Sequence, residues 1–582
     1  MFGNFAPFIP ASVEPPKAPE SVPAATPVTL PQCELGPTPD AQPIPDGPLV
    51  DLLQRIVRPS ELSMAHLEAA GVRVTCDAPI SQLIPNGDQI LETFATWDKY
   101  SRDECHPHNE ASRLPLSNGR LSPGCLVYLD RKQELSTSNE AAFRAVRRIP
   151  PPKCQSQARL GNAYEFFRHL EMFSAFWDDT SRQAKASEQQ EEEQQSEVDQ
   201  EGDSTMSGAD STTSTSTTAS SPERSPQSSA ESLFYRTGTG TQLPSGSRDG
   251  ILTAFIKLVA YDFGCNVSVP RIEPRLQLKS TIPGDPPKVK LSSYFRCDCT
   301  FINRTPTTRE AARALIVEGP VAAVYARHVT SFNERDSMYD LAREVIAALI
   351  TAQYRARQGK TPETVGKDVW WASKPRWGGG PGGPIGREIE SQQGEQIVGD
   401  KDAPPPAARG NPPEIPILAA GESLSSPYPK SARPGGGSRL SFVPKDDPGK
   451  ALKPDTFTPT SSKRLKKTGQ MPEYDRYRMV RPPSSSWDKK VRYEAIGRVP
   501  GADYDDIFVI SCLFHHISVV RVRVPDRLLE VLDGAEEKEP RSWGGLEVVR
   551  SKWFDFFLVE DRVEAMRCIW GVMAWLMRKV ET

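Results

Sequence analysis

Apolar positions follow their most regular pattern between residues 249 and 357. After Asp249, apolar side chains recur at intervals of three and four residues, a spacing that predicts a helix ending at Gly264. Apolar and polar residues then alternate from 290 to 303. Because successive strand side chains point to opposite sides, this alternation predicts a strand with one buried face.

Three further elements are predicted in this stretch. Thr307 or Thr308 is suited to cap a helix that Gly319 closes, and residues 321 to 329 form an apolar run typical of a short buried strand. A last helix with one apolar face opens at Asp336. Three charged residues are predicted to lie off that face: Arg343, Glu344 and Arg355. Helices that alternate with strands predict an α+β or α/β layer.

The C-terminal region shows a second series of strand and helix patterns. Residues 507 to 524 are rich in β-branched and aromatic residues, which predicts one long strand or two short ones. A short helix is predicted from Pro525, a strand from 548 to 558 and a long helix from 559 to 580. The apolar stripe of this last helix is too wide for a coiled-coil seam and suits a protein core.

Residues 49 to 185 carry mostly helical patterns, with one predicted strand at 126 to 129. The strongest predicted helix here runs from Gly161 to Arg182 and concentrates aromatic side chains on one side. Its aromatic stripe comprises Phe166, Phe167, Phe173 and Trp177, with Leu170 among them. So large an apolar surface has to be covered by the core or by a partner protein.

Between these patterns the composition changes to tracts that are too polar to form a core. The chain has 582 residues with 55 Pro, 40 Gly and 37% apolar residues, so much of it is predicted to lie outside packed domains. The predicted order is a Pro-rich disordered arm at 1–48, a mostly helical block at 49–185, an acidic Ser/Thr-rich linker at 186–247, an α/β block at 248–377, a Gly/Pro-rich linker at 378–470 and an α+β block at 471–582. The predicted fold class is α+β, with mixed small sheets flanked by helices and interrupted by long disordered linkers.

The last two folded blocks are expected to pack together. Each offers two or three predicted strands, a number that rarely forms a stable sheet alone. Residues 378–470 would then loop out of one domain as an insertion.

The acidic linker carries a candidate regulatory feature. Eight acidic residues and no Lys or Arg lie between 188 and 203, and the Ser/Thr tract that follows contains Ser221-Pro222 and Ser225-Pro226. Phosphorylation by proline-directed kinases would add further negative charge there. The alternative is an unmodified spacer.

Cysteine usage and targeting signals favour a reducing compartment and no membrane. Ten Cys are spread thinly, without the density of a disulfide scaffold, so free thiols are expected. No signal peptide precedes the first prolines, and no apolar run reaches the length of a membrane-spanning helix. The sequons at Asn266 and Asn303 are therefore expected to stay unmodified.

The first candidate metal ligands are Cys297 and Cys299. Both sulfurs share one face of a predicted strand, and no second Cys pair lies nearby at zinc-site spacing. Buried free thiols are the commoner role for such residues. Asp298, Glu310 and Asp340 form a conceivable acidic set, but nothing in their spacing requires one.

A second group of donors is denser. Cys105, His106 and His108 offer three ligands within four residues, and Cys125 is a distant fourth. Pro107 and the polar surroundings equally suit an exposed loop, which is the more common role for such a stretch.

His515 and His516 form the third candidate group. They lie inside an apolar strand pattern, so alternation predicts that one ring is buried and that the other faces the opposite side. A hydrogen-bonded core histidine is the commoner role, and no nucleophile motif accompanies the pair. The sequence therefore assigns no catalytic residue, cofactor or metal.

A basic region spans residues 430 to 492, where sixteen Lys and Arg stand against six acids, a local balance of +10. Its densest cluster predicts a nuclear import signal and consists of Lys463, Arg464, Lys466 and Lys467. Tyr and Trp residues interleave with the later charges, a mixture that binds phosphates and stacks on bases. The possible nucleic-acid contacts are Arg476, Arg478, Arg481, Lys489, Lys490 and Arg492. The alternative is a solubilising tether.

These features predict a non-enzymatic nuclear regulatory or scaffold protein. Its most plausible role is that of an accessory subunit of a chromatin or transcription complex, with protein partners and possible non-specific nucleic-acid contact. The alternative hypothesis is a divergent enzyme without recognisable motifs, with or without a metal ion, that uses residues around Cys297 and Cys299 or around His515 and His516.

Overall fold

The computed structural model describes residues 23–31, 47–56, 61–182, 236–244, 246–272, 274–282, 288–292, 297–327, 334–361 and 487–580. The predicted linker at 378–470 lies outside these residues, as do most of the arm at 1–48 and of the acidic linker with its Ser-Pro sites. The fold that follows is that of the described residues.

A nine-stranded mixed sheet organises the fold, in the order β1-β10-β9-β8-β6-β5-β2, with β11 beside β9 and β7 beside β6. Its strands are β1 (Val72–Thr75), β2 (Cys265–Ser268), β5 (Thr300–Arg304), β6 (Val317–Ala326), β7 (Val491–Tyr493), β8 (Tyr504–Leu513), β9 (His516–Pro525), β10 (Leu546–Arg550) and β11 (Phe554–Asp555). A separate hairpin joins β3 (Leu278–Ile282) to β4 (Lys288–Ser292). β6 pairs in parallel with β8, so strands from the 248–377 and 471–582 segments share one sheet.

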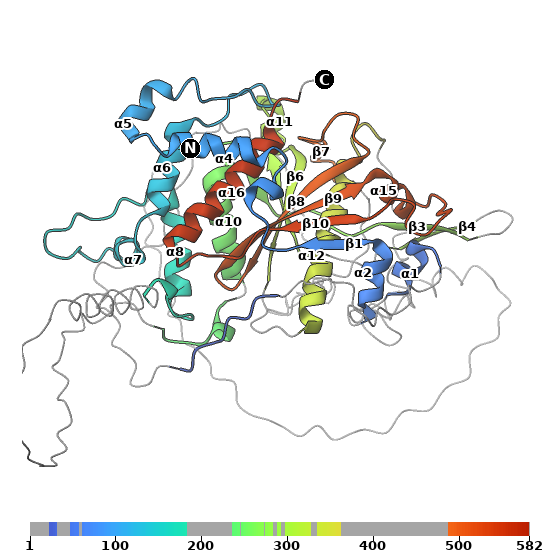
Figure 1. Cartoon of the computed structure of the whole chain (residues 1–582), viewed down its shortest axis with the longest axis horizontal. Coiled ribbons are helices and arrows are strands. Elements are labelled where there is room, and N and C mark those ends of the chain that lie inside the picture. The colour runs from blue at the N-terminus through green and yellow to red at the C-terminus, as the bar shows by residue number, and fades with distance from the viewer. Residues whose placement is uncertain are drawn as a thin grey trace, which may run out of the picture. The chain divides into compact units, whose positions relative to one another are not determined.

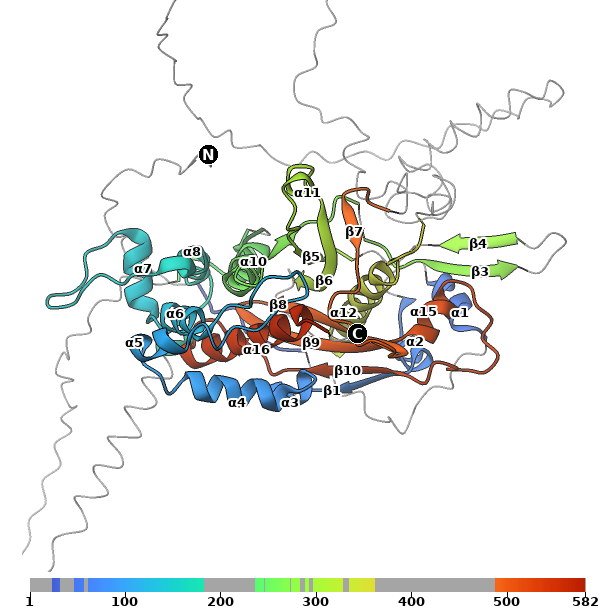
Figure 2. The ribbon, with the colours of Figure 1, turned by 90° about the horizontal axis from the view of Figure 1, so that it is seen from above.

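Helices cover both faces of this sheet (Figures 1 and 2). They are α1 (Leu49–Arg55), α2 (Met64–Ala70), α3 (Ile80–Leu83), α4 (Gly87–Trp97), α5 (Arg102–Cys105), α6 (Cys125–Leu135), α7 (Asn139–Arg147), α8 (Tyr164–Phe173), α10 (Gly246–Ala260), α11 (Arg309–Arg313), α12 (Glu334–Arg355), α15 (Asp526–Leu532) and α16 (Val559–Met577). The α+β fold class is thereby confirmed, with one large sheet and one hairpin in place of several small sheets.

Strand side chains alternate between two apolar cores, as the strand period of two requires. One core, against α8, α10 and α16, receives Val324, Ile510, Val519 and Val549. The other core, against α1, α2, α12 and α15, receives Ala323, Val509, Val520 and Val548. The central strands are therefore buried on both faces, which explains their nearly continuous apolar sequences.

Aromatic contacts join three distant segments of the chain in the first core. The Phe166 ring of α8 lies 5.1 Å from the Phe255 ring of α10 and 5.3 Å from the ring of Phe556, which follows β11. Phe255 and Phe556 are 4.9 Å apart. Such tilted and edge-to-face arrangements suit the charge distribution of aromatic rings and add to the effect of burial.

Several predicted elements are confirmed. The patterns after Asp249 and at 559–580 correspond to α10 and α16, and the pattern that begins at Pro525 corresponds to α15. The apolar run at 507–524 forms two strands, β8 and β9, which pair antiparallel as a hairpin.

Other predictions are wrong in detail. Residues 126–129 belong to helix α6, whose buried positions include Cys125, Tyr128 and Leu135, a helical spacing that the short apolar run concealed. α8 ends at Phe173, well before Arg182. Gly319 lies inside β6, and the left-handed residue after α11 is Leu315, with φ 57°.

The charges of α12 are also placed differently from the prediction. Arg343 is exposed as expected, but Glu344 and Arg355 are buried. Arg355 donates hydrogen bonds of 2.7 and 3.0 Å to the two oxygens of Asp505 on β8. The periodic pattern marked one apolar face, whereas the helix is enclosed on more than one side.

Candidate metal centre

The strand directions bring several ionisable residues to one edge of the sheet. β6, β8, β10 and β11 run the same way, so their carboxyl ends meet there. Arg327 follows β6, Arg550 ends β10 and Asp555 ends β11, while His515 follows β8. The antiparallel strand β9 begins at the same edge with His516.

His515 and His516 are positioned by a tight connection. β8 and β9 are joined by Phe514 and His515, and Phe514 has φ 52°. A bulky aromatic residue in this left-handed region is strained, and such strain concentrates at functional sites. Because His515 belongs to the turn, strand alternation does not apply to it, and both rings lie near Asp555 in place of pointing to opposite sides.

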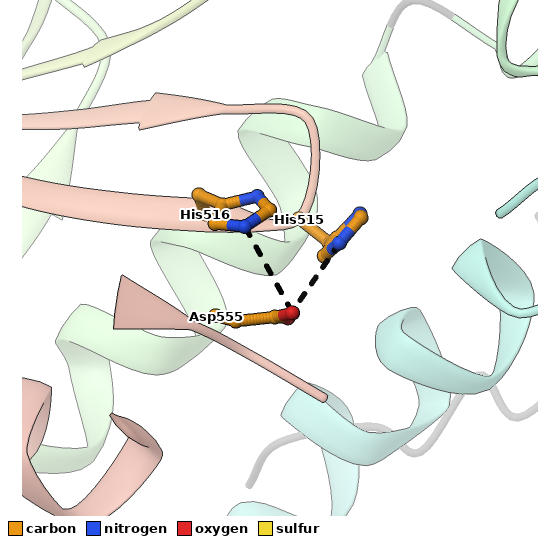
Figure 3. A group of neighbouring side chains, drawn as sticks. All are labelled: His515, His516 and Asp555. Carbon is orange, nitrogen blue, oxygen red and sulfur yellow. Dashed lines mark ion pairs between the residues drawn. The ribbon is translucent and has the colours of Figure 1, made fainter. Parts of the chain in front are cut away.

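Figure 3 shows the two imidazoles converging on one carboxylate. His515 Nε2 lies 3.6 Å from Asp555 Oδ1, and His516 Nε2 lies 3.8 Å from Asp555 Oδ2. One potential ligand atom from each residue fits within 4.8 Å of the other two. All three residues are enclosed, with His515 only 1% exposed.

Three ring nitrogens of this cluster have no hydrogen-bond partner among the residues that the structure describes: His515 Nδ1, His515 Nε2 and His516 Nδ1. Buried polar atoms are nearly always hydrogen-bonded, and an unsatisfied one costs about 1–3 kcal/mol. His515 is buried, as the expectation of a core histidine requires, and its ring pairs with the Asp555 carboxylate at 3.6 Å.

Burial and neighbouring groups shift the pKa values of His516 and Asp555. Burial, with a smaller contribution from His515, lowers the pKa of His516 to about 3, so its ring is neutral at pH 7. Burial would raise the pKa of Asp555, but interactions with His515, His516 and Thr180 outweigh it and lower the pKa to about 2. A neutral imidazole and an ionised carboxylate are the forms that bind metal ions.

The Asp555 carboxylate is oriented by two donors. The Thr180 hydroxyl donates a 2.6 Å hydrogen bond to Oδ2, and the backbone N–H of Phe557 donates a 2.8 Å bond to Oδ1. Aromatic rings enclose His515, with the Phe557 centroid 4.8 Å and the Trp177 centroid 6.1 Å away. Hydrogen bonds of this kind orient the ligands of metal sites, and apolar walls exclude solvent from them.

A second cluster at the same edge is a buried ion network. Glu344 pairs with both Arg327 and Arg550 and accepts a 2.6 Å hydrogen bond from the Ser511 hydroxyl. Asp340, one turn earlier in α12, pairs with Arg327. At most 2% of any of these four charged side chains is exposed, so they form a neutral, enclosed set.

The other acidic and thiol candidates do not assemble into a site. Asp298 and Glu310 are exposed, far from the buried environment of Asp340. Cys297 and Cys299 are buried neighbours as expected, and the Cys297 hydrogen bond together with burial raises the pKa of the Cys299 thiol. Among the described residues, no third Cys, His, Asp or Glu donor lies close enough to join these two thiols in a metal site.

Cys105 and Cys125 form a disulfide, which contradicts the expectation of free thiols for this pair. Local hydrogen bonds bring α5 and α6 together, because the side chains of Ser112 and Asn109 accept from the first backbone N–H groups of α6. His106 and His108 are exposed. The four residues therefore do not form a metal site.

Reduction of this disulfide is expected to lower the free energy of unfolding by about 3 kcal/mol, because the cross-link restricts the unfolded chain. Urea unfolding with and without dithiothreitol measures the difference, and Cys154→Ser, at an exposed thiol, is the control. Equal numbers of reactive thiols in denaturant before and after reduction would contradict the pairing.

The aromatic stripe of α8 and the turn after it belongs to the core. Phe166, Phe167 and Phe173 are fully buried and Trp177 is 2% exposed, so these side chains form no partner surface. The aromatic stripe therefore packs in the core, which was the other expected role. The part of the stripe that the N-terminal helices leave open is covered by α10, α16 and the residues after β11.

The basic region is described only from residue 487. Lys489, Lys490 and Arg492 are exposed, although Arg492 pairs with Glu318 at 2.8 Å. The Trp487 and Tyr493 rings pack on each other and around Arg357, so these two aromatics are engaged within the chain. The import cluster lies outside the described residues, as do Arg476, Arg478 and Arg481.

Asp555 and Thr180 were not identified from the sequence, and neither was the ion network. Asp555 is the single acidic residue in the aromatic run from Trp553 to Phe557, a stretch that the sequence predicts to be buried. Because a buried acidic side chain usually has a dedicated partner, this position could have been identified as a candidate. Thr180 has no comparable signal. Its role depends on the tertiary contact with β11.

Comparison with protein-family models, curated proteins and solved structures found no match for this chain. None of the helices in the described part of the chain has the length and apolar character required to cross a bilayer. The kind of ligand that this site could bind is therefore inferred from its own donor atoms.

Proposed function

We propose that the protein is a metal-dependent enzyme of unassigned reaction that holds one divalent transition-metal ion through His515, His516 and Asp555. The observation that carries the proposal is the convergence of two imidazoles on one buried carboxylate, with one donor atom of each residue within 4.8 Å of the other two. Imidazole and carboxylate donors suit zinc and other first-row metals.

The donor distances can be compared with those around a bound zinc ion. Zinc binds nitrogen and oxygen at about 2.0–2.2 Å, so two donors of one tetrahedral ion lie about 3.3–3.5 Å apart. His515 Nε2 and His516 Nε2 lie 3.6 and 3.8 Å from different oxygens of Asp555, and one donor atom of each residue lies within 4.8 Å of the other two. These separations have to shorten for the three atoms to bind one ion. Three is also the number of protein ligands in catalytic zinc sites, where the fourth ligand is a water whose pKa the ion lowers.

Purified full-length protein, stripped with a chelator and reloaded with zinc, is expected to retain about one ion per chain. His515→Ala, His516→Ala and Asp555→Asn each remove one of three ligands, so each is expected to lower the affinity at least about 100-fold. Metal analysis after gel filtration and competition with a chromogenic chelator measure content and affinity.

Two control variants test whether the loss is specific. His66→Ala removes a half-buried histidine of α2 that bonds Ser63, and Cys297→Ser alters the buried thiol pair. Both should retain zinc. Zinc-free wild-type protein after reloading, or equal affinity in all variants, would contradict the proposal.

A second candidate function is the nuclear regulatory or scaffold role. The basic cluster in the sequence favours it, together with the exposed Lys489 and Lys490 at the start of β7. The two proposals are independent because the cluster and the metal centre share no residue.

Alanine substitution of the cluster is expected to shift a tagged chain from the nucleus to the cytoplasm, because an import receptor would bind its positive side chains. The substituted residues are Lys463, Arg464, Lys466 and Lys467. Fluorescence microscopy measures the nuclear-to-cytoplasmic ratio, and Lys99→Ala with Lys538→Ala, at two exposed lysines outside the basic region, is the control. An unchanged distribution, or cytoplasmic wild-type protein, would exclude this import signal.

A further inference from the structure

The segment after α8, residues 174–182, covers two of the three proposed ligands. The Trp177 ring lies against His515, with centroids 6.1 Å apart, and the Thr180 hydroxyl bonds Asp555 Oδ2 at 2.6 Å. Trp177 is itself enclosed, since Gly240 packs so closely on its ring that a Cβ there would clash. The segment is therefore part of the wall of the site.

The polar attachments of this segment converge on the turn after β11. Asn139 Nδ2 donates to Asp179 Oδ1 at 2.8 Å, to Ser181 Oγ at 3.1 Å and to the Phe557 carbonyl at 2.9 Å. Arg562 holds the other end of this amide through a 2.5 Å bond to Asn139 Oδ1. Movement of the segment would therefore break its bonds to Asn139, the residue that also donates to the Phe557 carbonyl.

We propose that Thr180 is a positioning residue for the metal centre, and that metal binding and docking of residues 177–182 stabilise each other. This inference rests on the proposed function. The Thr180 hydroxyl and the Phe557 N–H each fix one oxygen of Asp555, so the carboxylate is already oriented when an ion arrives. If docking strengthens metal binding, metal binding strengthens docking by the same factor.

The first test compares Thr180→Val, which keeps the shape and removes the hydroxyl, with Thr180→Ser, which keeps the hydroxyl. Zinc affinity of the full chain is measured by competition with a chromogenic chelator. Thr180→Val is expected to lose about 10–100-fold in affinity, as for other residues that orient metal ligands, whereas Thr180→Ser stays within about threefold of wild type. Cooperative thermal unfolding of both variants checks that they are folded.

The second test measures docking directly. Zinc is expected to slow tryptic cleavage after Arg182 about tenfold in the wild-type chain, because cleavage requires local opening of the segment. The same addition should leave the rate unchanged in Thr180→Val. Cleavage after the exposed Lys153, which is not part of residues 174–182, serves as the internal standard.

The outcomes separate the two proposals. Wild-type protein that binds no zinc would overturn the proposed function and this inference with it. Zinc-binding wild-type protein, with Thr180→Val equal to it in affinity and in protection of Arg182, would overturn this inference alone. A loss of affinity in Thr180→Ser as large as in Thr180→Val would also contradict it, because the hydroxyl would not be the relevant group.

Discussion

Replacing Glu344 with Gln is expected to destabilise the protein by about 3–5 kcal/mol, the usual cost of removing one partner from a buried ion pair. The substitution keeps the size of the side chain and removes the charge that serves both Arg327 and Arg550. Asp340 remains beside Arg327, whereas the ion pair between Glu344 and Arg550 is lost. Urea unfolding followed by circular dichroism and tryptophan fluorescence measures the loss.

A second substitution, at an exposed ion pair, tests whether the loss of stability depends on burial of the pair or on the removed charge alone. Glu165→Gln also removes a paired carboxylate, but both side chains of its pair with Arg168 are exposed, by 60% for Glu165 and 54% for Arg168. Exposed pairs contribute about 0–1 kcal/mol, so this control should be nearly neutral. Equal effects of the two substitutions would contradict the role assigned to the buried network.

The pH dependence of the Glu344 effect has a defined sign. Burial opposes ionisation, but Arg550, Arg327 and Ser511 outweigh it and lower the pKa of Glu344. The resulting stabilisation is present above the ordinary glutamate pKa and is lost as the pH falls through the lowered value. The difference between wild type and Glu344→Gln should therefore shrink in acid, and a difference that grows below pH ~4 would exclude this mechanism.

Phe173→Asp is expected to prevent folding, because it buries an unpaired charge in a fully enclosed position of α8. Phe173 is fully buried and stacks on Trp177 with centroids 5.5 Å apart. The cost of burying such a charge exceeds about 4–5 kcal/mol, which is a large part of the stability of most domains. Soluble yield, near-ultraviolet circular dichroism and thermal unfolding measure the outcome.

The same helix supplies the control for this prediction. Tyr164, the first residue of α8, is 39% exposed, and an acid is favourable in the first turn of a helix. Tyr164→Asp should therefore change the stability by less than about 0.5 kcal/mol. Folded Phe173→Asp protein with wild-type stability would show that the ring is a surface group after all.

Local periodicity predicted most of the helices and strands, and it failed where local pattern and tertiary enclosure disagree. α10, α15 and α16 are amphipathic or apolar enough to be read directly. Residues 126–129 resemble a strand because four apolar residues carry too little information to distinguish periods of 2 and 3.6. Glu344 was placed on the solvent side because no local pattern indicates that arginines from β6 and β10 will meet it there.

The candidate site was half predictable for a related reason. His515 and His516 are adjacent in sequence and were identified as possible ligands. Asp555 was overlooked because its proximity depends on the pairing of β11 with β9, in which Asp555 stands opposite His516. Sheet register of this kind is a long-range property, since it is decided by the whole core and by no short stretch of sequence.

The strand order also constrains when the fold can form during synthesis. β8, β9 and β10 all lie within residues 504–550, yet they separate β1 from β6 in the sheet. The ribosome therefore releases β1, β2, β5 and β6, together with α10 and α12, long before the strands that join them exist. The apolar faces of these elements stay uncovered until the last part of the chain has been synthesised. Nascent and C-terminally truncated chains should therefore depend on chaperones and aggregate without them.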